Sequence, residues 1–175
     1  MAFADDLLEQ ALHLANRERK GPRQASLRRA VSTAYYALFH LLISEATLNW
    51  KRAEYRDALA RVFEHGKMKS ACRKKIGELT VYFKTNPRAG SELTVAQHLH
   101  RVAQTFVEAQ QNRHVADYDN SRVWARTAVL AEIESVANAF KSWHAIRNES
   151  VAQAFLVSLF GGKEPGKEQV PVPTV

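Results

Sequence analysis

Apolar side chains recur every three to four positions along most of this chain, a spacing that predicts amphipathic helices rather than strands. The segments with this period are 3–19, 24–47, 51–64, 91–117, 121–147 and 150–159. A shorter basic helix is expected at 67–79, followed by a loop at 80–91 that contains Asn86-Pro87 and Gly90. Because the connections are short and no run alternates convincingly with period two, the pattern predicts an all-α bundle.

Glycine and proline indicate where the helices stop and how the chain is divided. Gly21-Pro22 ends the first helix, and Asp119 or Asn120 is a suitable N-cap for the last long helix. From Gly161 onward the chain is rich in Pro, Gly, Lys and Glu, which is typical of disorder. The expected organisation is a helical bundle at 1–147, a short C-terminal helix at 148–160 and a disordered tail at 161–175.

The helix expected at 24–47 carries two incompatible faces. With about 100° between successive residues, the apolar side chains fall on one side: Leu27, Val31, Ala34, Leu38, Leu41 and Leu42. Four side chains that can donate or accept hydrogen bonds or protons fall within a narrow arc on the other side: Arg29, Ser32, Tyr36 and His40. An ordinary exposed helix face is built from Glu and Lys, so this face predicts a functional site.

A second polar feature lies at the end of the helix expected at 91–117. Its apolar stripe projects onto Arg113 and Asp117. Buried charges are costly unless they are paired, so either the helix frays here or these groups line a cleft. The structural alternative is an ion pair between the two residues across one helical turn.

Plainer structural roles are the alternatives for the polar residues of the helix at 24–47. For Tyr35 and Tyr36 we expect packing, with a hydroxyl bonded to a carboxylate such as Asp117. For Ser32 the alternative is a hydrogen bond back to its own helix. For His40 it is an interhelical hydrogen bond.

Composition limits the compartment and the cofactors. The chain has 175 residues, of which 46% are apolar, enough for one domain with a core. No run is long enough to span a membrane and no signal peptide is expected, so the cytoplasm is the expected location. The single Cys72, among basic neighbours that could lower its pKa, excludes an internal disulfide framework and a cysteine metal cluster. No histidine spacing suggests a metal site, and no cofactor is expected.

The positive charge points to a polyanionic partner. The formal net charge is +7, which favours nucleic acid. Much of it lies in two clusters: Arg17, Arg19, Lys20, Arg23, Arg28 and Arg29, and then Lys67, Lys69, Arg73, Lys74 and Lys75. Solvated helix ends and a loop are the alternative interpretation of each cluster.

Two stretches resemble the signatures of a known family. Arg28-Arg-Ala-Val-Ser-Thr-Ala-Tyr-Tyr-Ala-Leu-Phe-His40 and Arg113-His-Val-Ala-Asp-Tyr-Asp119 resemble the R-A-x-S-x-A-Y-Y-A-x-F-H and R-x-x-A-D-Y patterns of HEPN domains, in their prokaryotic stand-alone branch. HEPN stands for higher eukaryotes and prokaryotes nucleotide-binding. The resemblance covers residues 1–147. It implies an up-and-down bundle of four to five helices that dimerises and acts on RNA or nucleotides, often in toxin–antitoxin or phage-defence systems.

The resemblance also implies a metal-free cleavage of RNA in the catalytic members. In that chemistry a base takes the proton of a 2′-hydroxyl, the oxygen attacks the adjacent phosphorus, and a cation stabilises the phosphate charge. Those members carry Arg, then four to six residues, then His, and two such motifs meet across the dimer. Here Tyr118, Asp119 and Asn120 stand where that His is expected.

The catalytic motif is therefore interpreted as degenerate. A tyrosine, with a reference pKa of about 10, is a poor general base, and His40 is the alternative source of an imidazole. The candidate catalytic residues are Arg113, His40 and Tyr118. The candidate RNA- or nucleotide-binding residues are Arg29, Ser32, Tyr36, His40, Arg113 and Asp117.

Three functions remain open at this point. The first is a domain that binds RNA or a nucleotide in a cleft between the helices at 24–47 and 91–117. The second is a metal-independent endoribonuclease that places Arg113 on the phosphate. The third is a protein-interaction module, such as the partner of a nucleotidyltransferase or of an antitoxin. A homodimer is expected in each case from the family resemblance.

Overall fold

The computed structural model describes residues 3–85 and 90–161, and within these ranges it contains seven α-helices, one 3-10 turn and no strand. The helices are α1 (Phe3–Asn16), α2 (Gln24–Leu48), α3 (Arg56–Ala60), α4 (His65–Thr85), α5 (Ser91–Tyr118), α6 (Arg126–Ile146) and α7 (Ser150–Ser158), and the 3-10 turn is Ala53–Tyr55. The all-α prediction is therefore confirmed for these residues. The tail expected at 161–175 lies, from residue 162 onward, outside them.

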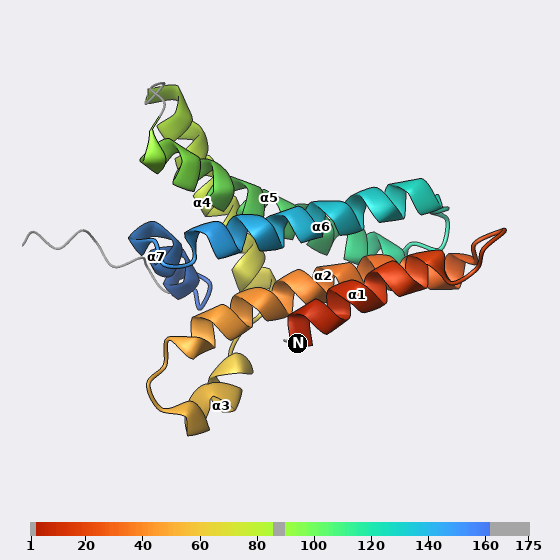
Figure 1. Ribbon diagram of the computed structural model, residues 1–175, viewed down its shortest axis with the longest axis horizontal. Helices are drawn as coiled ribbons and strands as arrows, with labels where there is room; N and C mark the ends of the chain where they lie inside the picture. The colour runs from red at the N-terminus through yellow and green to blue at the C-terminus, as the bar shows by residue number, and fades with distance from the viewer. Residues whose placement is uncertain (1–2, 86–89, 162–175) are drawn as a thin grey trace, which may run out of the picture.

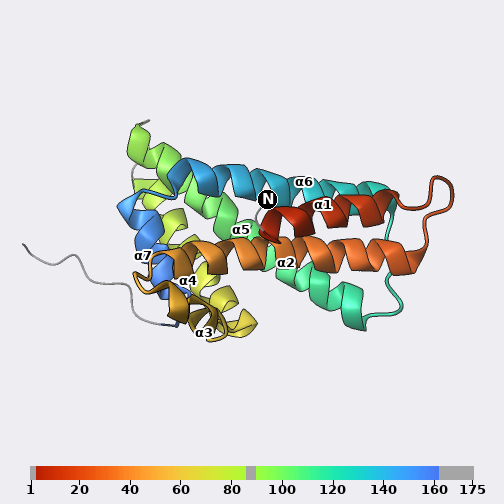
Figure 2. The same cartoon turned by 60° about the horizontal axis from the view of Figure 1, so that its bottom comes forward.

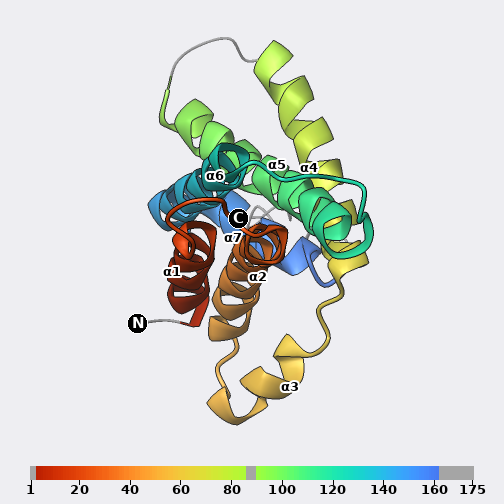
Figure 3. The same cartoon turned by 90° about the vertical axis from the view of Figure 1, so that its right-hand side faces the viewer.

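Four long helices form the body of the molecule. α1, α2, α5 and α6 lie side by side along its long axis, and α4 packs against α5 (Figure 1, Figure 2). α7 lies at one end of the bundle, next to the C-terminal end of α6 (Figure 2). Figure 3 shows that α3 projects from the bundle, and that α4 diverges from the other long helices.

The core lies between the apolar faces of these helices. Its largest fully buried side chains include Tyr35, Phe106, Trp143 and Phe155, the last of which comes from α7. Each such side chain stabilises the fold by about 1.5–3 kcal/mol relative to leaving it exposed. The apolar face predicted for α2 is confirmed, since all six of its residues are buried. Among the described residues, no helix is long and apolar enough to cross a membrane.

Two side chains at the start of α2 hold the connection between α5 and α6. Gln24 exchanges two hydrogen bonds of 2.9 and 2.8 Å with the backbone of Trp124. Arg28 donates three hydrogen bonds of 2.7–2.9 Å to carbonyl oxygens at the end of α5 and in the loop that follows. Carbonyls at a helix end need partners from outside the helix. Arg28, one of the basic cluster, therefore has a structural role.

The helix predicted at 51–64 is wrong over most of its length. The chain forms the 3-10 turn and the five-residue α3, and neither element contains a buried residue. Of the apolar residues that suggested the helix, Phe63 is buried, whereas Tyr55 and Val62 are exposed. Most helical stability in proteins comes from packing of the apolar face, and this face finds little to pack against.

The helix before α5 is longer than predicted. The short helix expected at 67–79 and the first part of the loop expected at 80–91 form the single helix α4, which begins at His65. Beyond Leu79, Tyr82 and Phe83 are partly buried against the core, and this packing supports the extra turns of the helix. Residues 86–89 of the expected loop lie outside the described part of the chain.

The last long helix begins later than predicted. The N-cap expected at Asp119 or Asn120 is wrong, because α6 begins at Arg126. Asp119 instead accepts hydrogen bonds from the backbone N–H and the hydroxyl of Ser121, at 2.9 and 2.6 Å. Such a local turn offers the backbone an alternative to a helix.

Candidate functional site

Four of the predicted site residues meet between α2 and α5. We call them the Arg113 cluster: Ser32 and Tyr36 from α2, and Arg113 and Asp117 from α5. Nη2 of Arg113 donates to the Tyr36 hydroxyl at 3.0 Å, and Nε lies 2.8 Å from Oδ2 of Asp117. The Ser32 hydroxyl donates to Oδ1 of Asp117 at 2.6 Å. The two helix faces found in the sequence are therefore parts of one polar network.

Arg113 lies between two aromatic rings. Its guanidinium carbon is 5.5 Å from the ring centroid of Tyr36 and 6.0 Å from that of Tyr118, which is 67% exposed. Both distances allow a cation–π attraction. Burial by itself lowers the pKa of Arg113, but Tyr36 and Asp117 hold this pKa above its usual value. The guanidinium stays charged while 21% of the side chain remains exposed.

The contacts of the cluster decide among the structural alternatives. The ion pair expected between Arg113 and Asp117 is present, and α5 continues to Tyr118 instead of fraying. The expectation that a tyrosine hydroxyl bonds to Asp117 is wrong, because Ser32 bonds there. Ser32, only 2% exposed, reaches across to α5 instead of bonding back to its own helix. A buried hydroxyl facing a carboxylate gains more from that charge-assisted bond.

His65, the first residue of α4, lies beside the cluster and was not found by sequence reasoning. Its Nδ1 is 2.6 Å from the Tyr35 hydroxyl oxygen. Its ring centroid is 4.2 Å from that of Phe39 and 6.0 Å from that of Tyr36, the tyrosine that also contacts Arg113. No local pattern marks this residue, since its importance comes from contacts with a helix some 30 positions earlier.

The surroundings of His65 keep its imidazole neutral at pH 7. Burial, then the positive charge of Arg113, and then repulsion from the His40 imidazole when that ring is protonated, lower the pKa of His65 below its usual value. Burial raises the pKa of Tyr35, so that hydroxyl keeps its proton. One proton lies between the Tyr35 oxygen and Nδ1, so the tautomer decides whether the second ring nitrogen donates a hydrogen bond or accepts a proton.

Two predicted residues lie apart from the hydrogen bonds of the cluster. Arg29 is exposed, and its neighbour Arg28 is the arginine that reaches α5. His40 packs edge-on against Phe3, with ring centroids 4.9 Å apart, and its ring centroid is 6.4 Å from that of Tyr36. Burial lowers the pKa of His40. His40 therefore lies next to Tyr36 on α2, on the side away from Arg113. Its imidazole is neutral at pH 7.

Cys72 has no part in this site. It is buried in α4, and burial raises the pKa of its thiol despite the basic residues that surround it in sequence. The possibility that these neighbours lower its pKa is therefore wrong. A buried, protonated thiol is a poor nucleophile.

The site combines a fixed cation with groups that bind or move protons. Arg113 is suited to contact two oxygens of one phosphate, and the neutral His65 is suited to exchange a proton near pH 7. Within the described residues, no group of three or more His, Cys, Asp or Glu side chains is arranged to hold a metal ion. Comparison with protein-family models, with curated proteins and with solved structures finds no match for this chain.

Proposed function

We propose that the Arg113 cluster binds a phosphate group of RNA or of a nucleotide, in a domain of HEPN type whose catalytic motif is degenerate. Such a domain would act in a toxin–antitoxin or defence-type system, as the resemblance implies. The single observation that carries the proposal is the state of Arg113. Its guanidinium is charged, partly exposed and held in one orientation by Tyr36 and Asp117.

Orientation matters because phosphate binding by arginine is directional. A guanidinium offers five N–H donors in a planar fork, and bidentate contact with phosphate needs that plane to be fixed. Nη2 donates a hydrogen bond to Tyr36, and Nε lies at ion-pair distance from Asp117 without forming an aligned hydrogen bond. The side-chain entropy that a free arginine loses on binding is therefore lost already on folding.

An affinity measurement tests this proposal. We expect Arg113→Gln to weaken the binding of a labelled single-stranded RNA about 10-fold or more. The control Lys141→Gln, which removes a positive charge from an exposed position of α6 outside the two basic clusters, should change it little. Wild-type affinity should fall steeply between 50 and 200 mM salt, because phosphate neutralisation releases counterions. Equal losses in the two variants, or an affinity that ignores salt, would overturn the proposal.

RNA cleavage is a second candidate function, and His65 favours it. Its neutral imidazole lies beside Tyr36, the ring that Arg113 also contacts, and is suited to take the 2′-hydroxyl proton. The 2′-oxygen then attacks phosphorus, the bond to the 5′-oxygen breaks, and that oxygen takes up a proton. The products are a 2′,3′-cyclic phosphate and a 5′-hydroxyl end, and Arg113 stabilises the charge on the phosphate.

Incubation with total RNA and EDTA tests the cleavage. We expect cyclic-phosphate ends that disappear in Arg113→Ala and His65→Ala but persist in His40→Ala. If only His40→Ala loses activity, His40 rather than His65 is the general base. Intact RNA over a broad pH range would leave only the binding function.

Dimerisation and a nucleotidyltransferase or antitoxin partner are further parts of the proposal, and they rest on the family resemblance. A dimer of this 19.8 kDa chain has twice that mass in sedimentation equilibrium. A monomer at all concentrations would contradict the dimer while leaving the phosphate site in place.

A further inference from the structure

The segment between α2 and Phe63 forms an arm that is not part of the core. We call residues 49–62 the α3 arm. It contains the 3-10 turn and α3, no residue of which is buried, and it projects from the bundle in Figure 1 and Figure 3. Ordering each residue costs about 1–2 kcal/mol of backbone entropy. Here only Ala60 packs partly against the core, so little burial offsets that cost, which points to a role outside the fold.

Large aromatic side chains lie exposed on this arm. Trp50 is 51% exposed and Tyr55 is 52% exposed, whereas the other two tryptophans, Trp124 and Trp143, are 6% and 0% exposed. The arm therefore carries the one exposed tryptophan of the chain, together with a second exposed ring five residues later. Exposed rings of this kind offer flat faces on which nucleic-acid bases can stack.

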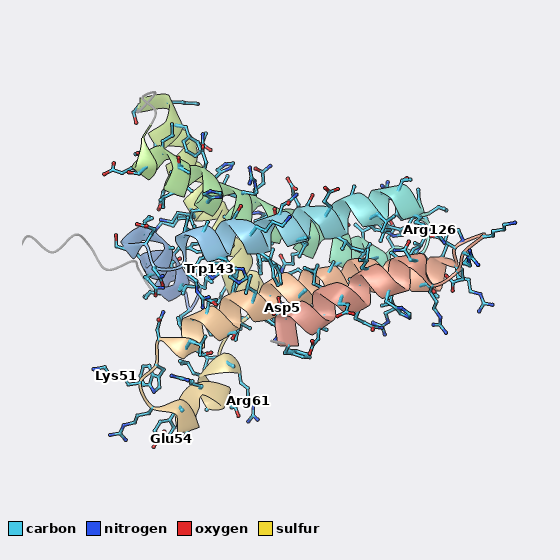
Figure 4. The ribbon with its side chains drawn as sticks, in the orientation of Figure 1. Asp5, Lys51, Glu54, Arg61, Arg126 and Trp143 are labelled. Carbon is cyan, nitrogen blue, oxygen red and sulfur yellow. The ribbon has the colours of Figure 1, made fainter. Side chains whose placement is uncertain are left out.

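Positive charges alternate with these rings. The arm has four cations and two anions, so its formal charge is +2: Lys51, Arg52, Arg56 and Arg61 against Glu54 and Asp57. Figure 4 shows the labelled Lys51, Glu54 and Arg61 on the outside of the arm. Arg56 donates to the carbonyl oxygens of Leu48 and Trp50 at 3.2 and 3.1 Å. That contact fixes the backbone next to the Trp50 ring.

The arm also adjoins the row of site residues on α2. A groove of about 500 Å³ lies between arm and bundle, lined on the arm side by Arg56 and Ala60 and on the bundle side by His40 and Phe3. The His40 ring is a neighbour of Tyr36, which belongs to the Arg113 cluster. The groove therefore leads from the arm to the ring beside Tyr36; its lining does not include Arg113, and it includes the acids Asp5, Glu45 and Asp57.

We propose that the α3 arm is a stacking surface for single-stranded RNA. Bases stack on Trp50 and Tyr55, while Lys51, Arg52 and Arg61 neutralise phosphates on either side. The strand continues past His40 to the Arg113 cluster, so this inference rests in part on the proposed function. Interleaved rings and cations are what single-strand binding needs. A duplex hides the faces of its bases, and a protein partner does not require the excess of cations.

The intrinsic fluorescence of Trp50 provides the test. We expect a 12-nucleotide oligouridylate to quench tryptophan emission, and a duplex of the same length to quench it much less. Trp50→Ala should weaken the binding of the single strand about 10-fold, and Trp50→Phe should restore most of it. Val81→Ala, which truncates a side chain 61% exposed on α4, is the matched control and should bind as the wild type does.

The outcomes separate this inference from the proposed function. If Trp50→Ala binds the single strand as tightly as Val81→Ala while Arg113→Gln binds weakly, the arm is not the surface and the phosphate site stands. If the single strand quenches Trp50 but binds Arg113→Gln as tightly as it binds the wild type, the stacking surface is supported and the phosphate site is contradicted. Equal quenching by single strand and duplex overturns stacking on the arm. Absence of RNA binding at low salt overturns both proposals.

Discussion

Helix α5 meets polar groups of two neighbouring helices, α2 and α6, and the two contacts differ in character. Toward α2, Arg113 and Asp117 form an ion pair that Ser32 and Tyr36 complete. At the contact with α6, Glu132 of α6 faces Asn112 and Glu108 of α5, and within the described residues its Oε1 is buried without a hydrogen bond. One contact of α5 therefore pairs opposite charges, whereas the other buries an acid of α6 next to a second acid.

The unpaired acid responds by staying protonated. Burial, together with the nearby negative charge of Glu108, raises the pKa of Glu132 to about 8, although a hydrogen bond from Asn112 lowers it. On the opposite side, Arg113 keeps its charge because its partners compensate for burial. The comparison shows that burial by itself favours the uncharged form of an ionisable side chain. A partner of opposite sign has to keep it ionised where a ligand can reach it.

The largest expected effect concerns Glu132 and the pH dependence of the free energy of unfolding. The pKa of Glu132 in the native state, about 8, lies above its value near 4.3 in the unfolded chain, so the native state binds more protons between these values. Stability is therefore lost as the pH rises from about 4.5 to 8. We expect Glu132→Gln to stabilise the protein on the order of 3 kcal/mol at pH 9 and little at pH 4.

Urea unfolding at the two pH values measures this effect. The matched control is Glu134→Gln, which removes the same charge from an exposed position two residues away on α6. If the two variants have the same stability at pH 9, Glu132 is not held protonated, and the contrast between the two sides of α5 disappears.

The next largest effect comes from removing Asp117, which contacts both Ser32 and Arg113. We expect Asp117→Ala to lower the free energy of unfolding by about 1–2 kcal/mol, because the Ser32 hydroxyl loses its acceptor and the Arg113 guanidinium loses its ion-pair partner. A double-mutant cycle with Ser32→Ala should give a coupling of about 0.5–1 kcal/mol. Strictly additive losses in the cycle would mean that the Ser32–Asp117 hydrogen bond contributes nothing.

The smallest expected effect is a change in the pKa of His65 when the charge of Arg113 is removed. Arg113→Gln removes one of the charges that lower the pKa of His65, so that pKa should rise. Because the pKa of His65 is lower in the native than in the unfolded state, stability is lost as the pH falls below about 6.5, and the variant should lose less. Titration of the histidine C–H signals by NMR checks this. An unchanged His65 titration in Arg113→Gln would separate His65 from the cluster.

Much of the site was predictable from local spacing. The apolar and polar faces of α2, and the ion pair between Arg113 and Asp117, follow from the helical period. The partner of each hydroxyl did not follow from it. Ser32 takes Asp117 and Tyr36 takes Arg113 because of the rotation of α2 against α5, which spacing within either helix leaves undetermined.

The sequence by itself determined that this protein is helical, which face of α2 is buried, and that Arg113 and Asp117 share one side of α5. Only the tertiary structure decided that Arg28 rather than Arg29 reaches α5, that His65 lies beside the Arg113 cluster, and that the segment 49–62 is an exposed arm. The physical reason is the range of the interactions. Helical periodicity is a property of neighbours along the chain, whereas these contacts depend on how separate helices pack.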